Sequence, residues 1–299
     1  MIKSRGDLLR AFFVVLPSIA AVGIFIYGFI GWSLRASFSA WDGIIPDFTF
    51  VGFKNYLEVF SNVRFQKDLW NTLYFTFFFL LLSICWGLLL AWLLDRKVKG
   101  EALLRNIFLF PMSISFVVTG VVWRWIFNPT VGVNALLKLL GFSGANWGWY
   151  TDPTSVLKFH LALIPVILAA SWQLTGYTMA MFLAGLRGIP EDLIDHARID
   201  GASELYIFRR IILPLLKPIT LSAMIVLGHF SLKIFDLIYT MTGKGPAFAT
   251  DVPAIFMFET TFRGNHYAEG AVISIVMLLL VAVVIVPYLY STFRKEIKR

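Results

Sequence analysis

The chain has 299 residues, 58% of them hydrophobic, and a mean hydropathy of +0.76. Soluble globular proteins are about 45–50% apolar, so this excess excludes an ordinary soluble domain and indicates a membrane protein. The net charge of +8 fits basic cytoplasmic loops better than nucleic-acid binding, and the single cysteine, Cys85, can form no intrachain disulfide.

Six apolar segments are long enough to cross a bilayer, which takes about 20 residues. In chain order they are 11–34, 72–94, 104–127, 156–186, 215–240 and 270–291. None of them alternates with period two, so the sequence predicts an all-α membrane protein rather than a barrel. The first run is too long for a signal-peptide core and is read as a retained anchor. Pro111, Pro165 and Pro218 are expected to kink their helices. We predict one transmembrane domain over 1–299.

The orientation follows from the distribution of Lys and Arg. The N-terminus, the 95–105 loop, the 187–217 segment and the tail carry 16 of them, whereas the loops on the other side carry 8. Because cytoplasmic segments collect basic residues, both termini and the 187–214 segment are predicted to be cytoplasmic. The loops 35–71, 128–155 and 241–269 then face outward.

The 187–214 segment is unusually charged for a connection between two apolar runs. Pro190 suits a first helical turn, Gly201 suits the left-handed position after a helix, and Ser203 suits the cap of a second helix that Pro214 closes. The result is a short helix–turn–helix. Its first helix is acidic, and an acidic helix is poorly placed against a negatively charged leaflet, so a protein partner is favoured over lipid.

Signatures of catalysis and nucleotide binding are missing. The four His residues are scattered, and the sequence contains no H-E-x-x-H or G-x-S-x-G pattern and no metal-type Cys spacing. The TGKGP at 242–246 lacks the pattern of a phosphate-binding loop. We therefore expect no catalytic residue, no metal site and no cofactor on this chain, and any ATP must act on a partner.

The stretch IPEDLIDHARIDGASELYIFRRIILPLLKP resembles the cytoplasmic signature loop of ABC importer permeases, in which EAA is followed by a Gly and then I-x-L-P. The blocks FVGFKNYLEVF, LWNTLYF, GVNALLKLLG and LIYTMTGKGPAFAT are similar to those of the sugar permeases of the maltose and glycerol-3-phosphate type. The resemblance covers roughly residues 50–290. It departs from the family at Asp195 and His196, where relatives have Glu and Ala, and at Lys244, where they have Gly.

The resemblance implies a type I ABC importer permease with six transmembrane helices and a coupling helix between the fourth and fifth. It implies a second, homologous permease as heterodimer partner, two cytoplasmic ATPase subunits that bind ATP and Mg, and an external solute-binding protein. The residues expected to couple to the ATPase are Glu191, Asp195, His196, Ala197, Asp200 and Gly201.

The candidate substrate path lies on the fourth and fifth helices. The resemblance assigns Tyr177, Phe230 and Ser231 to it, while the residues themselves suggest Trp172 and Gln173, an aromatic and an amide at mid-membrane depth. Lys233 and Asp236 are charges within a membrane helix, and they are expected to share one face of it. They are read either as part of a polar path or as a self-neutralising structural pair.

The function indicated is a permease subunit of an ATP-driven importer for a sugar or polyol, in a prokaryotic inner membrane. The alternatives are an ABC permease for an amino acid or an anion and, less favoured, a secondary transporter. The latter would leave the charged hairpin without a role, and it would predict paired broken helices from an inverted repeat, which the sequence does not reveal.

Overall fold

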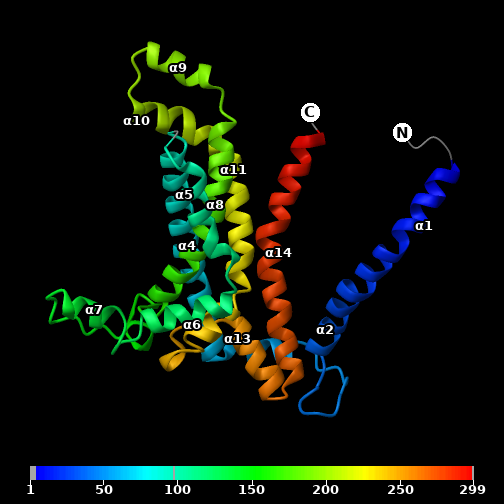
Figure 1. Ribbon diagram of the computed structural model, residues 1–299. Coiled ribbons are helices and arrows are strands. Elements are labelled where there is room, and N and C mark those ends of the chain that lie inside the picture. The colour runs from blue at the N-terminus through cyan, green and yellow to red at the C-terminus, as the bar shows by residue number, and fades with distance from the viewer. Residues whose placement is uncertain (1–4, 97, 298–299) are drawn as a thin grey trace. The chain divides into compact units, whose positions relative to one another are not determined.

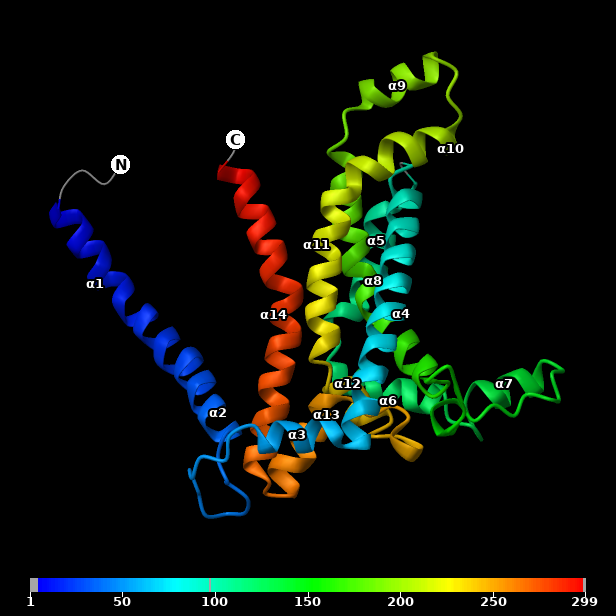
Figure 2. The same ribbon diagram turned by 180° about the vertical axis from the view of Figure 1, so that it is seen from behind.

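The computed structural model describes residues 5–96 and 98–297, drawn in Figure 1 and from behind in Figure 2. The basic residues Lys3, Lys97, Lys298 and Arg299, used to predict orientation, lie outside this range. The helices are α1 (Arg5–Val22), α2 (Phe29–Ser37), α3 (Lys54–Ser61), α4 (Val63–Leu94), α5 (Glu101–Leu109), α6 (Phe116–Ile126), α7 (Val133–Leu139), α8 (Leu163–Arg187), α9 (Glu191–Ile199), α10 (Glu204–Ile207), α11 (Leu213–Leu232), α12 (Asp236–Met241), α13 (Pro253–Phe258) and α14 (Tyr267–Ile297). One antiparallel pair of two-residue strands, β1 (Ser155–Val156) and β2 (Phe159–His160), accompanies them.

The predicted all-α membrane fold is confirmed. Over the described residues, five helices are long and apolar enough to cross a membrane, and a bent helix pair makes a sixth if it is counted as one span. The five are Phe12–Ser37, Val63–Leu94, Leu163–Arg187, Glu204–Leu232 and Tyr267–Tyr290, and the bent pair is Glu101–Ser113 with Phe116–Ile126. Each corresponds to one of the six segments expected from the sequence.

Two predicted helices are broken. The kink expected at Pro111 in the third span is confirmed, whereas the break in the fifth span was not predicted. In the third span, α5 ends in a 3-10 turn at Phe110–Ser113, which contains Pro111, and α6 leaves at 99° to it. In the fifth span, α11 ends at Leu232, and a new helix, α12, begins at Asp236.

Two proline predictions were wrong. Residues 155–160 form the β1–β2 hairpin, so α8 begins only at Leu163. Pro165 therefore lies in the first turn, where backbone N–H groups have no acceptor within the helix and a proline causes no kink. Pro214 does not close the second short helix either. α10 continues through a π-helical turn at Phe208–Ile212 into α11, with Pro214 in the first turn of α11.

The chain divides into two compact units, Met1–Val63 with Phe256–Leu279 and Arg64–Ile255 with Leu280–Arg299. The prediction of one domain over 1–299 therefore stays a prediction. In the first unit, the loop after α2 meets the chain before α14: Trp41 stacks on Tyr267 with ring centroids 4.8 Å apart, and Gly43 donates its backbone N–H to Asn265 O at 2.9 Å. Aromatic stacking and backbone bonds hold this unit together.

In the second unit, α8 is the central helix. It packs against α5, α6, α11 and α12. In its apolar 18-residue stretch 67% of the residues are buried, against 28% in the corresponding stretch of α4. Thr178 of α8 donates a hydrogen bond to Ser83 O of α4 at 2.7 Å. α12 packs closely on α6 because Gly120 has no side chain: a Cβ there would lie 2.9 Å from Leu237 O. In lipid, small residues allow such close backbone approaches.

Candidate functional site

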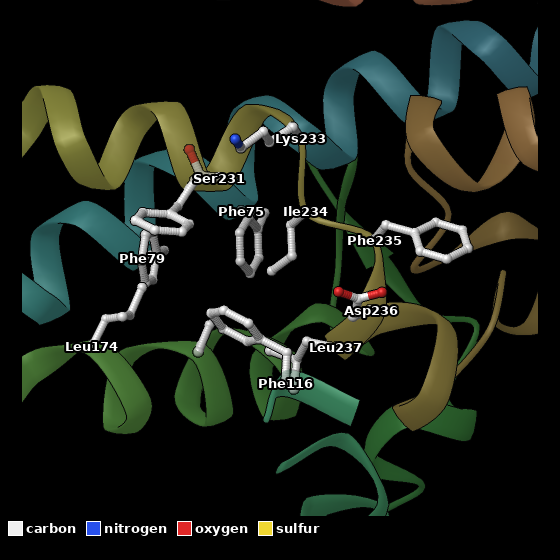
Figure 3. Close-up of a pocket in the computed structure, with 12 residues that line it drawn as sticks. Phe75, Phe79, Phe116, Leu174, Ser231, Lys233, Ile234, Phe235, Asp236 and Leu237 are labelled. Carbon is white, nitrogen blue, oxygen red and sulfur yellow. The ribbon is translucent and has the colours of Figure 1, made fainter. Parts of the chain in front are cut away.

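A cavity of about 210 Å³ lies at the break between α11 and α12. In Figure 3 residues from α4, α6, α8 and the α11–α12 segment gather around it. Predicted path residues Phe230, Ser231, Lys233 and Asp236 are brought together here. The full lining is Phe75, Phe79, Phe116, Ala170, Leu174, Phe230, Ser231, Lys233, Ile234, Phe235, Asp236 and Leu237. The cavity therefore combines aromatic walls with a few polar and charged groups.

Lys233 and Asp236 do not share a helix face, which corrects the prediction. Lys233 is the C-cap of α11, with φ −120° and ψ 17°, and Asp236 is the first residue of α12. Within the described chain no ion pair joins them, so the self-neutralising pair is not formed. The ammonium of Lys233 instead lies 6.0 Å from the ring centroid of Phe230. Both charges thus line the cavity from separate ends of the break.

Ser231 is buried and hydrogen-bonded on both sides. Its hydroxyl donates to Gly228 O at 2.9 Å and accepts from Thr76 Oγ1 of α4 at 2.9 Å. The second bond ties α11 to α4 at the edge of the cavity. Ser231 therefore shapes the cavity wall here, while its predicted contact with a solute stays a prediction.

Two predicted residues on α8 have different surroundings. Gln173 is 1% exposed and donates from Nε2 to Ile114 O at 2.6 Å, which satisfies a backbone carbonyl freed by the break between α5 and α6. Tyr177 is half-buried and lies three residues after Leu174, a residue of the cavity lining. Residues three apart are neighbours on a helix surface, so Tyr177 extends the cavity face of α8 toward α9.

Trp172 is not part of this cluster. It lies five residues before Tyr177, about 140° around the helix, and it lines a separate apolar pocket with Trp86 and Trp123. Its ring centroid is 5.6 Å from that of Trp123. The structure thus places Trp172 outside the cavity, and Gln173, the next residue, is not among the lining residues either.

The sequence analysis missed four aromatic residues of the cavity, which are Phe75, Phe79, Phe116 and Phe235. Phe75 and Phe79 of α4 are buried and stack with centroids 5.5 Å apart, and Phe116 begins α6. The first two lie in the run FTFFFLLL, in which Phe77 is 59% exposed. Phe75 and Phe79 are four residues apart, a spacing that puts them on one face of the helix. Because nearly every residue of this run is apolar, the sequence does not show that this face is the buried one.

The predicted coupling helix is α9, which stands with α10 at one end of its unit in Figure 1. Pro190 is its N-cap, and Glu191 and Asp192 lie in the first turn, where the helix dipole favours acids. After Asp200 the chain turns at Gly201, whose φ is +83°. Gly201 N–H bonds to Arg198 O and Ala202 N–H to Ala197 O, both at 3.0 Å, which is the Schellman arrangement.

The turn leads directly into α10, and the end of α8 that precedes the hairpin is bonded to neighbouring residues of α5 and of the loop after α4. Ser203 caps α10 by accepting from Tyr206 N–H at 3.3 Å, as the sequence predicted. At the end of α8, Arg187 donates to Glu101 at 2.6 Å and lies 3.9 Å from Asp95. The end of α8 that leads into the hairpin is therefore attached to the loop after α4 and to the first residue of α5.

Arg198 bridges the two arms of the hairpin. Its Nε donates to Glu204 at 2.8 Å, and its Nη1 donates to Asp195 at 3.1 Å. The hydrogen bond to Glu204, more than any other contact, raises the pKa of the Arg198 guanidinium. Asp195, which replaces the glutamate of the family pattern, is thus engaged within the hairpin.

The other predicted coupling residues lie at the surface. Glu191, His196 and Asp200 are exposed, while Ala197 is half-buried against the core formed by the ends of α4, α8 and α11. Their contact with an ATPase stays a prediction, but their exposure leaves α9 accessible to a partner.

Residues 83–299 match the family model described as "Binding-protein-dependent transport system inner membrane component". Over 98% of its length the chain is 40% identical to a probable ABC transporter permease protein of Pyrococcus horikoshii, of which it covers 99%. It is 36% identical to the xylose/arabinose import permease protein XacH of Haloferax volcanii, with 94% of this chain and 86% of that protein covered.

A solved structure has the same fold. It is the crystal structure of a bacterial ABC transporter involved in the import of the acidic polysaccharide alginate, and it matches with a TM-score of 0.76 over 94% of both chains at 22% identity. The fold of this chain, over nearly its whole length, is therefore one that a solved transport protein also adopts.

Proposed function

Because the chain belongs to the family of inner membrane components of binding-protein-dependent transport systems, we propose that it is the permease subunit of an ATP-driven importer for a sugar or polyol. The observation that carries the proposal is the course of α8. This helix lines the cavity with Ala170 and Leu174, ends at Arg187, and leads directly into α9. One largely buried helix, with about 20 Å between Leu174 and its end, thus connects the cavity to an exposed hairpin.

The sugar assignment rests on the chemistry of the cavity. Phenyl rings such as Phe75 and Phe116 offer flat faces to the C–H surfaces of a sugar ring, while Lys233 and Asp236 supply a hydrogen-bond donor and an acceptor. A relative is named for xylose and arabinose import, which supports the same class. An anionic solute is the second candidate, because the ammonium of Lys233 would attract it. The carboxylate of Asp236 in the same cavity would repel it.

The cavity also supports a two-permease path. Its volume of about 210 Å³ is below the roughly 300–1,000 Å³ of typical ligand pockets. A second, homologous permease would complete the path, with this chain forming one half of it. An external solute-binding protein would deliver the solute, as the family description implies.

ATP and Mg would be bound by two cytoplasmic ATPase subunits that receive α9, and this chain would have no catalytic role of its own. ATPase closure would draw the hairpins of the two permeases together and open the path outward, and hydrolysis would reset it. This scheme places the chain in a prokaryotic inner membrane with both termini in the cytoplasm.

The test is solute uptake by the complete complex in liposomes, with its binding protein and labelled sugars. We expect uptake that requires ATP, and Phe230→Ala should lower it roughly tenfold, a loss of about 1.4 kcal/mol of transition-state binding, without reducing the amount of bound ATPase. Phe77→Ala, at a 59% exposed position of α4, is the matched control and should have no effect. Uptake that follows an ion gradient without ATP would overturn the proposal and favour a secondary transporter.

A further inference from the structure

α3 is held at the level where the first span ends. Asn55 donates from Nδ2 to Ser37 O at 3.0 Å and to Ser39 O at 2.8 Å. The hydroxyl oxygens of Ser37 and Tyr56 lie 2.8 Å apart, and Ser37 is the last residue of the span Phe12–Ser37. In Figure 2, α3 runs crosswise to the beginning of α14, which belongs to the same compact unit. α3 therefore lies along the membrane boundary, and its eight residues are too few to cross a bilayer.

Aromatic residues mark the same level. Trp32 of α2 is 48% exposed, and its ring centroid lies 5.2 Å from that of Phe48 and 6.4 Å from that of Trp41. The guanidinium of Arg35 lies 4.7 Å from the ring centroid of Phe48. Tryptophan is enriched at membrane–water interfaces, and arginine near the end of a span extends its charged head to the same level. The loop after α2 thus begins at the interface.

One side of α3 is apolar and exposed. Residues are about 100° apart around a helix axis, so Phe53, the N-cap, shares a side with Leu57 and Phe60, which follow it by four and seven positions. Leu57 is 71% exposed, Phe53 69% and Phe60 47%. The ring of Phe53 is held against Phe38, with centroids 5.3 Å apart. We call Phe53, Leu57 and Phe60 the apolar face of α3.

The other two sides of α3 have different surroundings. Val59 is fully buried and marks the inward side. Lys54 and Glu58 lie on the third side with their charged groups 3.9 Å apart, and Ser61, three residues after Glu58, shares that side. The pair has no net charge, so it gives α3 no attraction to anionic lipid. A basic side is not required here, because the loop 35–71 is predicted to face away from the negatively charged cytoplasmic leaflet.

We propose that α3 is an interfacial helix whose apolar face inserts between the lipids of the leaflet in which the first span ends. Such helices bury their apolar side about 5–10 Å deep, at the boundary between headgroups and acyl chains. The first span gains little support from its own chain, because no residue in its apolar 18-residue stretch is buried within the described residues. The bonds of Asn55 and Tyr56 to the end of α2 then hold this span at a fixed depth.

The insertion is tested by fluorescence quenching in the complete complex in liposomes. Cys85→Ala removes the single cysteine of the chain, and one new cysteine at a time carries a polarity-sensitive label, with partner subunits that lack cysteine. A quencher attached high on the lipid acyl chains should quench the label several-fold more strongly in the apolar-face variants Leu57→Cys and Phe60→Cys than in the controls. The matched controls, on the charged side, are Glu58→Cys and Ser61→Cys, which aqueous iodide should quench more strongly.

Two results would overturn the insertion. The first is equal quenching by lipid at all four positions, because an inserted helix must show its two sides. The second is shielding of Leu57→Cys from lipid and iodide alike, which would show that a protein subunit covers the apolar face. All four positions are exposed, so the substitutions should leave the fold intact.

The hold on the first span is tested by its depth. A Cβ at Gly31 of α2 would meet no atom within 4 Å, so Gly31→Cys can carry the same label. Leu57→Asp combined with Phe60→Asp should change the ratio of quenching by lipids that carry the quencher high and low on the acyl chain. Glu58→Ala combined with Ser61→Ala is the control and should keep the wild-type ratio. A wild-type ratio in the Asp variant would refute the role of α3 in holding the span.

Discussion

The Arg64–Ile255 unit has ion pairs at both ends, and they differ in burial. At the end away from the hairpin, called the outer end after its predicted orientation, Arg64 Nε lies 2.6 Å from Asp251 Oδ2, with the arginine side chain 15% exposed and the aspartate 0% exposed. In the α9–α10 hairpin, the pairs of Arg198 join side chains that are all more than half exposed. Exposed pairs are screened by water and contribute little stability, whereas breaking a buried pair leaves an uncompensated charge.

The outer network is also more extensively connected. Asn71 of α4 donates to both Phe248 O and Asp251 O at 2.9 Å, and the guanidinium of Arg64 lies 4.9 Å from the ring centroid of Phe248. These bonds fix the loop after α12 to the beginning of α4. The outer end is therefore a permanent anchor, while the hairpin keeps its shape through local bonds that leave its surface available.

The largest effect is expected at the anchor. Asp251→Ala would remove the fully buried carboxylate that pairs with Arg64 Nε at 2.6 Å and should destabilise the protein by about 3–5 kcal/mol. Thermal unfolding of the purified protein in detergent measures the change. Asp47→Ala removes an exposed carboxylate from the loop between α2 and α3 and is the control. Equal unfolding temperatures for the two variants would show that the buried partner of Arg64 contributes no more stability than an exposed carboxylate does.

A smaller, more local effect is expected at the hairpin turn. Gly201 has φ +83°, and a Cβ there would meet no atom within 4 Å, so Gly201→Val tests backbone strain without a clash of the Cβ. The left-handed conformation costs an ordinary residue about 1–2 kcal/mol. The variant should reach the membrane at normal levels but lose uptake per ATP hydrolysed.

Gly144→Val is the control for that variant. Gly144 also has open space around its Cα, but it lies in an outer loop and has no positive φ. Wild-type uptake by Gly201→Val at normal expression would show that the hairpin tolerates a reshaped turn, contrary to its proposed role in coupling.

The cap of α10 provides a weaker perturbation of the same hairpin. Ser203→Ala removes the acceptor for Tyr206 N–H and should cost about 1 kcal/mol. Hydrogen exchange at the amides of α10 measures the loss. Ser203→Asp keeps a capping oxygen and should restore protection. If Ser203→Ala also speeds hydrogen exchange at the amides of α4, the hairpin does not open independently of the bundle.

The spans and the hairpin could be read from the sequence because their signals are local. Hydropathy locates the spans, and Pro190, Gly201 and Ser203 mark the ends of α9 and α10 within a few residues. Each of these residues acts through its own backbone preference or through a bond to a near neighbour, so no tertiary information is needed. The ion pair of Arg64 with Asp251 joins residues 187 positions apart, and no local pattern predicts it.

The break at the cavity escaped prediction for a tertiary reason. The stretch HFSLKIFDLIYT contains no Gly or Pro, so local preference favours one helix, yet α12 turns away to pack on α6 beside Gly120. The faces of α8 were equally hidden, since it is apolar on every side and gives no amphipathic signal. Trp172 and Tyr177 therefore looked alike in the sequence although they line different surfaces.

The smallest effect concerns pH at the outer anchor. Asn71 uses its amide N–H groups on Phe248 and Asp251, so its Oδ1 accepts from His160 Nδ1 at 3.0 Å. Burial, with a smaller contribution from Lys67, lowers the pKa of His160 below 6.5. The folded protein therefore binds this proton less readily than the unfolded chain does.

Stability should accordingly fall as the pH drops through the unfolded-state value near 6.5, and it should be fully present above that value. His160→Gln keeps an N–H donor for Asn71 but cannot titrate, so the change in unfolding temperature between roughly pH 7.5 and 5.5 should be smaller in this variant. The difference between the two proteins isolates His160 from the other titrating groups. If acid destabilises both equally, the anchor does not sense pH through His160, and its stability depends on the buried ion pair of Arg64 with Asp251.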